Sequence, residues 1–253
     1  MKTLTRQPLV VLLSMTLLAA GMMLGCDEAG EREARPKDKA SQKAKTGEPK
    51  KVRLTKNIYL EVLPDKKRRV HVNAEVCLRE GQLELFLCRK QTKEHEAILT
   101  ADVDAFKLHA ALIAAGAEAG SPVRFVPRYR PASGTTIKVF VQYKDKGKQV
   151  TVPAKSWITN AKTKKPMEND WVFAGSRLVT NPLDPDGKKH YLANDGDVIC
   201  VSNFETALLD LPIKSPKDDV ERFFVANTRL IPPLETKVVV ILEPVVEAKK
   251  DKK

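Results

Sequence analysis

The stretch CRKQTKEHEAIL, from Cys88 to Leu99, gathers the side chains of this chain that are most capable of chemistry. The thiol of Cys88, the imidazole of His95 and the carboxylate of Glu96 are groups that bind metal ions or support thiol-dependent catalysis. The dipeptide His95-Glu96 resembles the start of the zinc motif H-E-x-x-H, but Leu99 stands where that motif needs its second histidine. One functional hypothesis is therefore a metal- or thiol-dependent enzyme that uses Cys88, His95 and Glu96.

The order of polar and apolar residues favours a strand, a polar turn and a second strand over the same stretch. Residues 90–93 are expected to form the turn, His95 to point with Ala97 and Leu99 toward packed side chains, and Glu96 to point the other way. This arrangement predicts no metal ligand, catalytic residue or cofactor. It leaves a shallow ligand cleft as the functional hypothesis, lined by Cys88, Lys93, His95, Glu96 and Trp171. Trp171 is interpreted either as a cleft residue or as part of the core.

Three further thiols remain once Cys26 is assigned to the lipidation motif described below: Cys77, Cys88 and Cys200. An odd number allows at most one disulfide in an oxidising compartment. The hairpin expected below places Cys77 and Cys88 away from each other, and a pairing of Cys88 with Cys200 is left open. Three half-buried free thiols are the simpler alternative.

Two local patterns predict the fold class. Apolar residues alternate with polar ones from Val70 to Leu78 and again from Leu83 to Leu87, which predicts two strands joined by a turn at Glu80-Gly81. In that hairpin Val76 faces Leu85 and Leu78 faces Leu83.

A helix is expected from residue 102 onward, with Asp102 as N-cap, an apolar face of Val103, Phe106, Ala110 and Ile113, and a stop at Gly116 or Gly120. The run TKVVVILEP near the end suits a central strand covered on both faces. The predicted class is α+β, a largely antiparallel sheet with one principal α-helix packed on it.

The first 26 residues have the pattern of a bacterial export signal. A basic start, an uncharged run from Pro8 to Leu24 and the sequence MLGC resemble a lipobox, which implies cleavage before Cys26 and lipidation of its thiol. We therefore expect a signal peptide at 1–25, a disordered charged tether at 26–53, one globular domain at 54–247 and a basic disordered tail at 248–253. Localisation follows as a lipid-anchored protein of the cell envelope, on the periplasmic face of the inner membrane if Asp27 acts as a retention signal.

The net charge of +12 would ordinarily suggest a nucleic-acid partner. Most of the excess lies in the two ends, because residues 54–247 carry 29 basic and 25 acidic side chains. The basic ends favour anionic lipid headgroups instead. We expect no nucleic-acid partner; the membrane, reached through lipidated Cys26, and an unknown envelope protein or cell-wall ligand are the expected partners.

Several uncommon blocks, among them LREGQLELFLC, HAALIAAGAEAGSPVRF, DWVFAGS, NDGDVICVSNF and IPPLETKVVVILEP, occur in an order that resembles the YdjY-domain family. The resemblance spans roughly residues 55–245. It implies a bacterial exported domain, often lipid-anchored, and carries no settled activity. The leading functional expectation is a lipid-anchored envelope domain with a non-catalytic binding or structural role; the enzyme that uses Cys88, His95 and Glu96 is the alternative.

Overall fold

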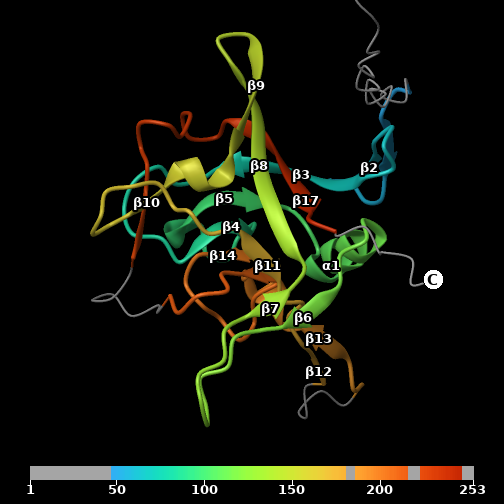
Figure 1. Cartoon of the computed structure of the whole chain (residues 1–253), viewed down its shortest axis with the longest axis vertical. Helices are drawn as coiled ribbons and strands as arrows, with labels where there is room; N and C mark the ends of the chain where they lie inside the picture. The colour runs from blue at the N-terminus through green and yellow to red at the C-terminus, as the bar shows by residue number, and fades with distance from the viewer. Residues whose placement is uncertain (1–46, 181–185, 216–222, 247–253) are drawn as a thin grey trace, which may run out of the picture. The chain divides into compact units, whose positions relative to one another are not determined.

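The computed structural model describes residues 47–180, 186–215 and 223–246, and its central feature is a closed barrel of 8 strands. Around the ring the order is β3, β17, β8, β11, β15, β14, β4 and β5, and β5 pairs again with β3 (Figure 1). The strands β14 and β15, and likewise β4 and β5, are parallel neighbours, and the other pairs are antiparallel. The strand bounds are Arg68–Val76 (β3), Leu85–Arg89 (β4), Ala97–Ala101 (β5), Thr136–Asp145 (β8), Trp171–Phe173 (β11), Ile199–Cys200 (β14), Leu209–Asp210 (β15) and Lys237–Pro244 (β17).

Further strands extend the barrel at its edges. The strand β2 (Ile58–Val62) pairs with the first part of β3, and β1 (Lys50–Arg53) pairs with β2. The strand β9 (Lys148–Pro153) pairs with β8, so that the two form a long hairpin that projects from the barrel (Figure 1).

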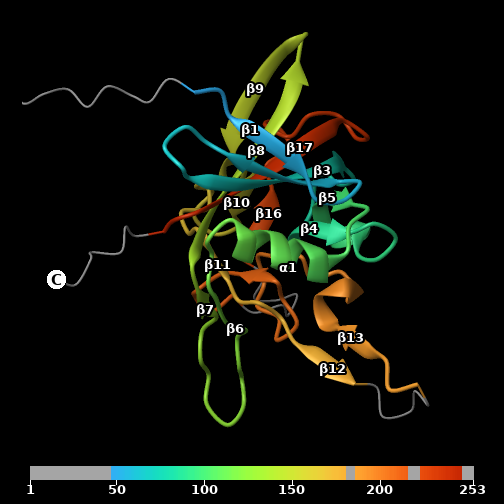
Figure 2. The ribbon, with the colours of Figure 1, turned by 90° about the vertical axis from the view of Figure 1, so that its right-hand side faces the viewer.

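Shorter elements fill the connections. Three two-stranded pairs are formed by β6 (Ala119–Ser121) with β7 (Ser133–Gly134), β10 (Ile158–Asn160) with β16 (Phe224–Ala226), and β12 (Leu178–Thr180) with β13 (Lys189–Tyr191). Three 3₁₀ turns occur at Glu94–Glu96 (η1), Ala154–Trp157 (η2) and Leu192–Asp195 (η3). The loop between β6 and β7 and the β8–β9 hairpin project at opposite ends of the barrel in both views (Figures 1 and 2).

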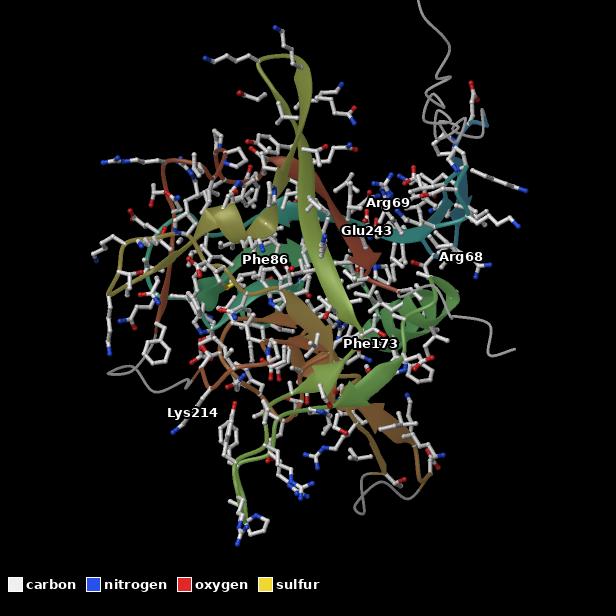
Figure 3. The ribbon with its side chains drawn as sticks, in the orientation of Figure 1. Arg68, Arg69, Phe86, Phe173, Lys214 and Glu243 are labelled. Carbon is white, nitrogen blue, oxygen red and sulfur yellow. The ribbon has the colours of Figure 1, made fainter. Side chains whose placement is uncertain are left out.

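The barrel interior forms the main core. The largest fully buried side chains of the core include Trp157, Trp171, Phe86 and Phe173, of which Phe86 and Phe173 are labelled in Figure 3. The Phe86 ring lies 5.7 Å from the Trp171 ring and 6.4 Å from the Trp157 ring. Aromatic contacts of this kind add to the free energy gained by burying the rings. The run predicted as a central strand is β17, which pairs with β3 on one side and β8 on the other, so that prediction is confirmed.

The predicted helix exists, but its boundary and its buried face were wrong. The helix α1 (Ala105–Ala114) begins after Asp104, whose carboxylate accepts hydrogen bonds from the backbone N–H of Phe106 at 2.8 Å and of Lys107 at 3.4 Å. Phe106 and Ile113 of the expected inner face are 49% and 53% exposed, and the buried residues are Ala105, Leu108, Ala111 and Leu112. Because the helix is apolar on both sides, spacing alone does not identify the face that packs.

The predicted α+β class is wrong, since the described chain is mostly strand and its sheet closes on itself. The closing contacts pair Glu75 with Thr100 and Val76 with Leu99, so that β5 lies between β3 and β4. The expected hairpin, in which Val76 would face Leu85, does not form. Closure and parallel pairing bring together strands that no turn connects, and alternation of apolar residues indicates a buried face without indicating the neighbouring strand.

Part of the segment predicted as a disordered tether forms a strand. Residues 50–53, which were predicted to belong to the tether, form strand β1. All four side chains are exposed, so the sequence has no alternation of apolar and polar residues there that would indicate a strand. The predicted signal peptide at 1–25, Cys26, Asp27 and the predicted tail at 248–253 lie outside the described residues. Among the residues that are described, no helix is long and apolar enough to cross a membrane.

Candidate functional site

Two of the five side chains expected to share a cleft lie in the core. Cys88 on β4 and Trp171 on β11 are both 0% exposed, and the Trp171 indole Nε1 donates a hydrogen bond of 2.7 Å to the backbone carbonyl of Cys200. Trp171 is thus a core residue. A buried thiol and a buried indole provide no surface that a ligand from solvent could reach.

The stretch does form a strand, a turn and a second strand, but His95 lies elsewhere than expected. His95 and Glu96 belong to the 3₁₀ turn η1, and the His95 side chain is 77% exposed instead of packed with Ala97 and Leu99. Its Nε2 lies 3.8 Å from a carboxylate oxygen of Glu96, so the expectation that the two side chains point apart is also wrong. Successive side chains are about 120° apart around a 3₁₀ turn, whereas in a strand they point to opposite faces.

Lys93 is held by a partner 104 positions away in the sequence. Its Nζ lies 2.8 Å from Oδ1 of Asp197 and 4.5 Å from the centre of the Phe204 ring, and the two charged side chains are 26% and 5% exposed. Burial alone would lower the pKa of Lys93, but the hydrogen bond and the charge of Asp197 outweigh it and raise that pKa. Lys93 therefore forms a half-buried ion pair with Asp197.

The three described thiols are free, and two of them meet. Cys77 and Cys88 interact through their side chains, contrary to the hairpin register, and the Cys77 Sγ also donates to the backbone carbonyl of Ala97 at 3.1 Å. The contact with Cys88 raises the pKa of Cys77, and the same contact lowers the pKa of Cys88. Burial raises the pKa of Cys200. Within the described ranges, no group of three or more His, Cys, Asp or Glu side chains could hold a metal ion.

A groove of about 690 Å³ opens where β2 and β5 leave β3. The strand β2 pairs with β3 as far as Val72 and β5 joins β3 only at Glu75, so the segment between these points faces the groove. The groove is lined by Lys56, Asn57, Asn73, Ala74, Glu75, Lys90, Thr100, Ala101, Asp102, Lys237, Val238 and Val239. We call this site the lysine groove. Its volume lies in the range of small-ligand sites.

Three ammonium groups and two carboxylates determine the charge of the lysine groove. Lys90 Nζ lies 2.9 Å from Glu75 Oε1, Lys237 Nζ contacts Glu75 Oε2, and Lys56 Nζ lies 3.5 Å from Asp102 Oδ2. Hydrogen bonds from Lys237 and Lys90 lower the pKa of Glu75. The groove therefore carries an excess of one positive charge, and Glu75 is shared by two lysines.

The lysine groove is suited to binding an anionic group. Lys56 and Lys237 have side chains that are 78% exposed, so their ammonium groups can turn from the protein carboxylates toward a ligand. The amides of Asn57 and Asn73 add neutral donors and acceptors, and Ala74 and Val239 add apolar contact. This site was not predicted from the sequence, because its lysines lie far apart in the chain and only the strand order brings them together.

A second polar cluster is buried at β15. Asp210 is 0% exposed, and its Oδ1 accepts hydrogen bonds from the backbone N–H of Leu211 at 2.7 Å and from the Asn203 amide at 3.1 Å. Its Oδ2 has no hydrogen-bond partner among the described residues. Burial raises the pKa of Asp210 to about 7, and the nearby charge of Asp197 acts in the same direction.

A family model described as YdjY domain matches residues 62–243, which cover every strand from β3 to β16 and nearly all of β17. No curated protein and no solved structure gives a significant match to the chain.

Proposed function

We propose, for a chain that belongs to the YdjY-domain family, that it is a lipid-anchored protein of the cell envelope that binds an anionic ligand without catalysis. The observation that carries the binding role is the convergence of Lys56, Lys90 and Lys237 on one groove. The MLGC sequence at Cys26 supports the anchor. A cell-wall fragment that bears carboxylates matches the charge of the groove.

The arrangement of side chains favours binding over the thiol- or metal-dependent enzyme. Cys88 is fully buried whereas His95 is largely exposed, so the groups that such an enzyme needs do not line one accessible pocket. The residues that line the lysine groove include no histidine, cysteine or serine. Lysines paired with carboxylates are suited to holding an anion in place, and none of them is activated as a nucleophile by burial.

The triple variant K56Q/K90Q/K237Q is expected to bind soluble peptidoglycan fragments about 10- to 100-fold more weakly than the parent protein, because charge-assisted contacts contribute about 1.5–3 kcal/mol each when they are fully formed and less when solvent-exposed. Isothermal titration calorimetry measures the affinity. The matched control is K144Q/K146Q/K148Q, which removes three exposed lysines from the β8–β9 hairpin. Equal affinities of parent and triple variant, or an equal loss in the control, would contradict the proposed site.

The anchor has a separate test. The Cys26→Ser variant is expected to leave the membrane fraction or to accumulate as an unprocessed precursor, because the lipid is attached through the Cys26 thiol. Membrane fractionation with mass spectrometry of the N-terminus distinguishes these products. Normal processing with full membrane retention in the variant would refute lipidation at this residue.

A further inference from the structure

The loop between β6 and β7 combines exposed apolar side chains with unpaired positive charge. Val126 at its tip is 76% exposed and Phe125 is 41% exposed. The exposed arginines beside them are Arg124, Arg128 and Arg130, and none of the three forms an ion pair with a described residue. The sequence holds no acidic residue between Glu118 and Asp145. This loop therefore presents cations without compensating carboxylates next to exposed apolar side chains.

The loop has a defined shape. Arg124 and Arg130 exchange two backbone hydrogen bonds, of 3.0 Å and 2.7 Å, which close its base. The Phe125 and Tyr129 rings lie 6.1 Å apart across the tip. In both views the chain between β6 and β7 projects as a narrow loop beyond the ends of these strands (Figures 1 and 2). Phe125, Val126 and Arg128 thus lie together in the turn that the Arg124–Arg130 pair closes.

We infer that this loop inserts its tip, Phe125 and Val126, into the interface of an anionic lipid bilayer while the three arginines contact lipid phosphates. An apolar tip flanked by cations is the pattern of segments that lie in membrane interfaces, where both kinds of contact are satisfied together. An acidic protein surface would match the arginines but would leave Val126 without an apolar environment. The lipid surface is therefore the occupant that matches both features.

The inference rests on the proposed anchor for the presence of a nearby membrane. The 23 residues from Asp27 to Pro49 span at most about 80 Å when extended. A domain of about 200 residues has a radius of gyration of about 16 Å. The tether is therefore long enough for the loop to reach the bilayer that holds the lipid, whichever side of the barrel the tether leaves from.

The test uses the full-length protein reconstituted into vesicles of phosphatidylcholine alone or with phosphatidylglycerol, in which acyl chains are brominated to quench tryptophan fluorescence. The native Trp157 and Trp171 are 1% and 0% exposed within the core, so a tryptophan introduced as Phe125→Trp reports the loop tip. The control is Lys148→Trp on the β8–β9 hairpin, whose lysines lack exposed apolar neighbours at the tip. Mass spectrometry of Cys26 in the same preparation reports the anchor separately.

Phe125→Trp is expected to be quenched in the anionic vesicles, and the quenching is expected to fall to the level of neutral vesicles when R124Q, R128Q and R130Q are added. Lys148→Trp is expected to remain unquenched in both. Absence of quenching of Phe125→Trp in anionic vesicles overturns the inference, and so does equal quenching of the two tryptophans, because anchoring alone would then explain it. Protection of the loop arginines by an added acidic protein, without quenching, would assign the loop to a protein partner and would also overturn it.

Discussion

When the pH rises from 4 to 8, the parent protein is expected to lose about 4 kcal/mol of unfolding free energy that the Asp210→Asn variant does not lose. Asp210 is fully buried, and burial raises its pKa from the ordinary 3.8 to about 7. Between these two values the unfolded chain has released the proton while the folded chain still holds it. The parent protein therefore loses stability as the pH rises through this interval, at about 1.36 kcal/mol per pH unit.

Urea unfolding at pH 4, 6 and 8 measures this difference in pH dependence. The asparagine cannot ionise, so the variant lacks this loss, although its amide leaves one buried donor unpaired at a cost of about 1–3 kcal/mol that is the same at every pH. Asp145→Asn at the exposed β8–β9 hairpin is the matched control. Parallel pH profiles for Asp210→Asn and the parent would show that Asp210 is ionised in the folded protein at neutral pH.

The positions of the strands were easier to predict than the pairing between them. The alternation from Val70 to Leu78 and from Leu83 to Leu87 indicated strands correctly, and the structure has β3 and β4 in these segments. Their pairing was wrong because β5 lies between them and pairs with both. The apolar run of β17 was interpreted correctly as a central strand, since it pairs with β3 on one side and with β8 on the other.

The helix shows which features can be predicted from neighbouring residues and which depend on the rest of the fold. The predicted N-cap Asp102 lies two residues before the actual cap, Asp104, whereas Gly116, one of the two predicted stops, follows the C-cap Ala115 with a positive φ. The choice between the Phe106 face and the Leu108 face depends on what lies opposite. Leu108 packs inward while the C-terminal end of the helix is held by Arg68 of β3, which donates a hydrogen bond of 2.9 Å to the Ala114 carbonyl (Figure 3). That contact joins residues 46 positions apart and has no local signature.

The candidate site also depends on contacts between residues far apart in the chain. Residues 88–99 looked like a chemical cluster because thiol, imidazole and carboxylate are adjacent in the sequence, yet the fold buries Cys88 and leaves His95 in solvent. The lysine groove could not be predicted because Lys56, Lys90 and Lys237 lie far apart in the chain, in two connections and at the start of β17. Proximity in a sheet depends on strand order, and the predicted order was wrong at the point where the groove opens.

Replacement of Lys93 by methionine is expected to destabilise the protein by about 3–5 kcal/mol, because it leaves the Asp197 carboxylate buried without its cation. Asp197 has a side chain that is 5% exposed, and Lys93 Nζ lies 2.8 Å from it. The Thr206 hydroxyl also donates to Asp197, but a hydroxyl carries no net charge to offset the carboxylate. Urea unfolding at neutral pH measures the loss. The methionine keeps the apolar contact with Phe204, so the result reports the charge rather than lost packing.

A double-mutant cycle with Asp197→Asn separates the ion pair from its surroundings. If the pair is the reason for the loss, Lys93→Met in the Asp197→Asn background is expected to cost at least 1 kcal/mol less than in the parent, since the buried charge is then absent. A cost below about 1 kcal/mol for Lys93→Met in the parent, or additive effects in the cycle, would place Lys93 among ordinary surface lysines. The same variant tests the cleft predicted from the sequence. If Lys93 binds a ligand, its replacement lowers affinity and leaves stability unchanged; if Lys93 neutralises Asp197, its replacement lowers stability and leaves binding at the lysine groove unchanged.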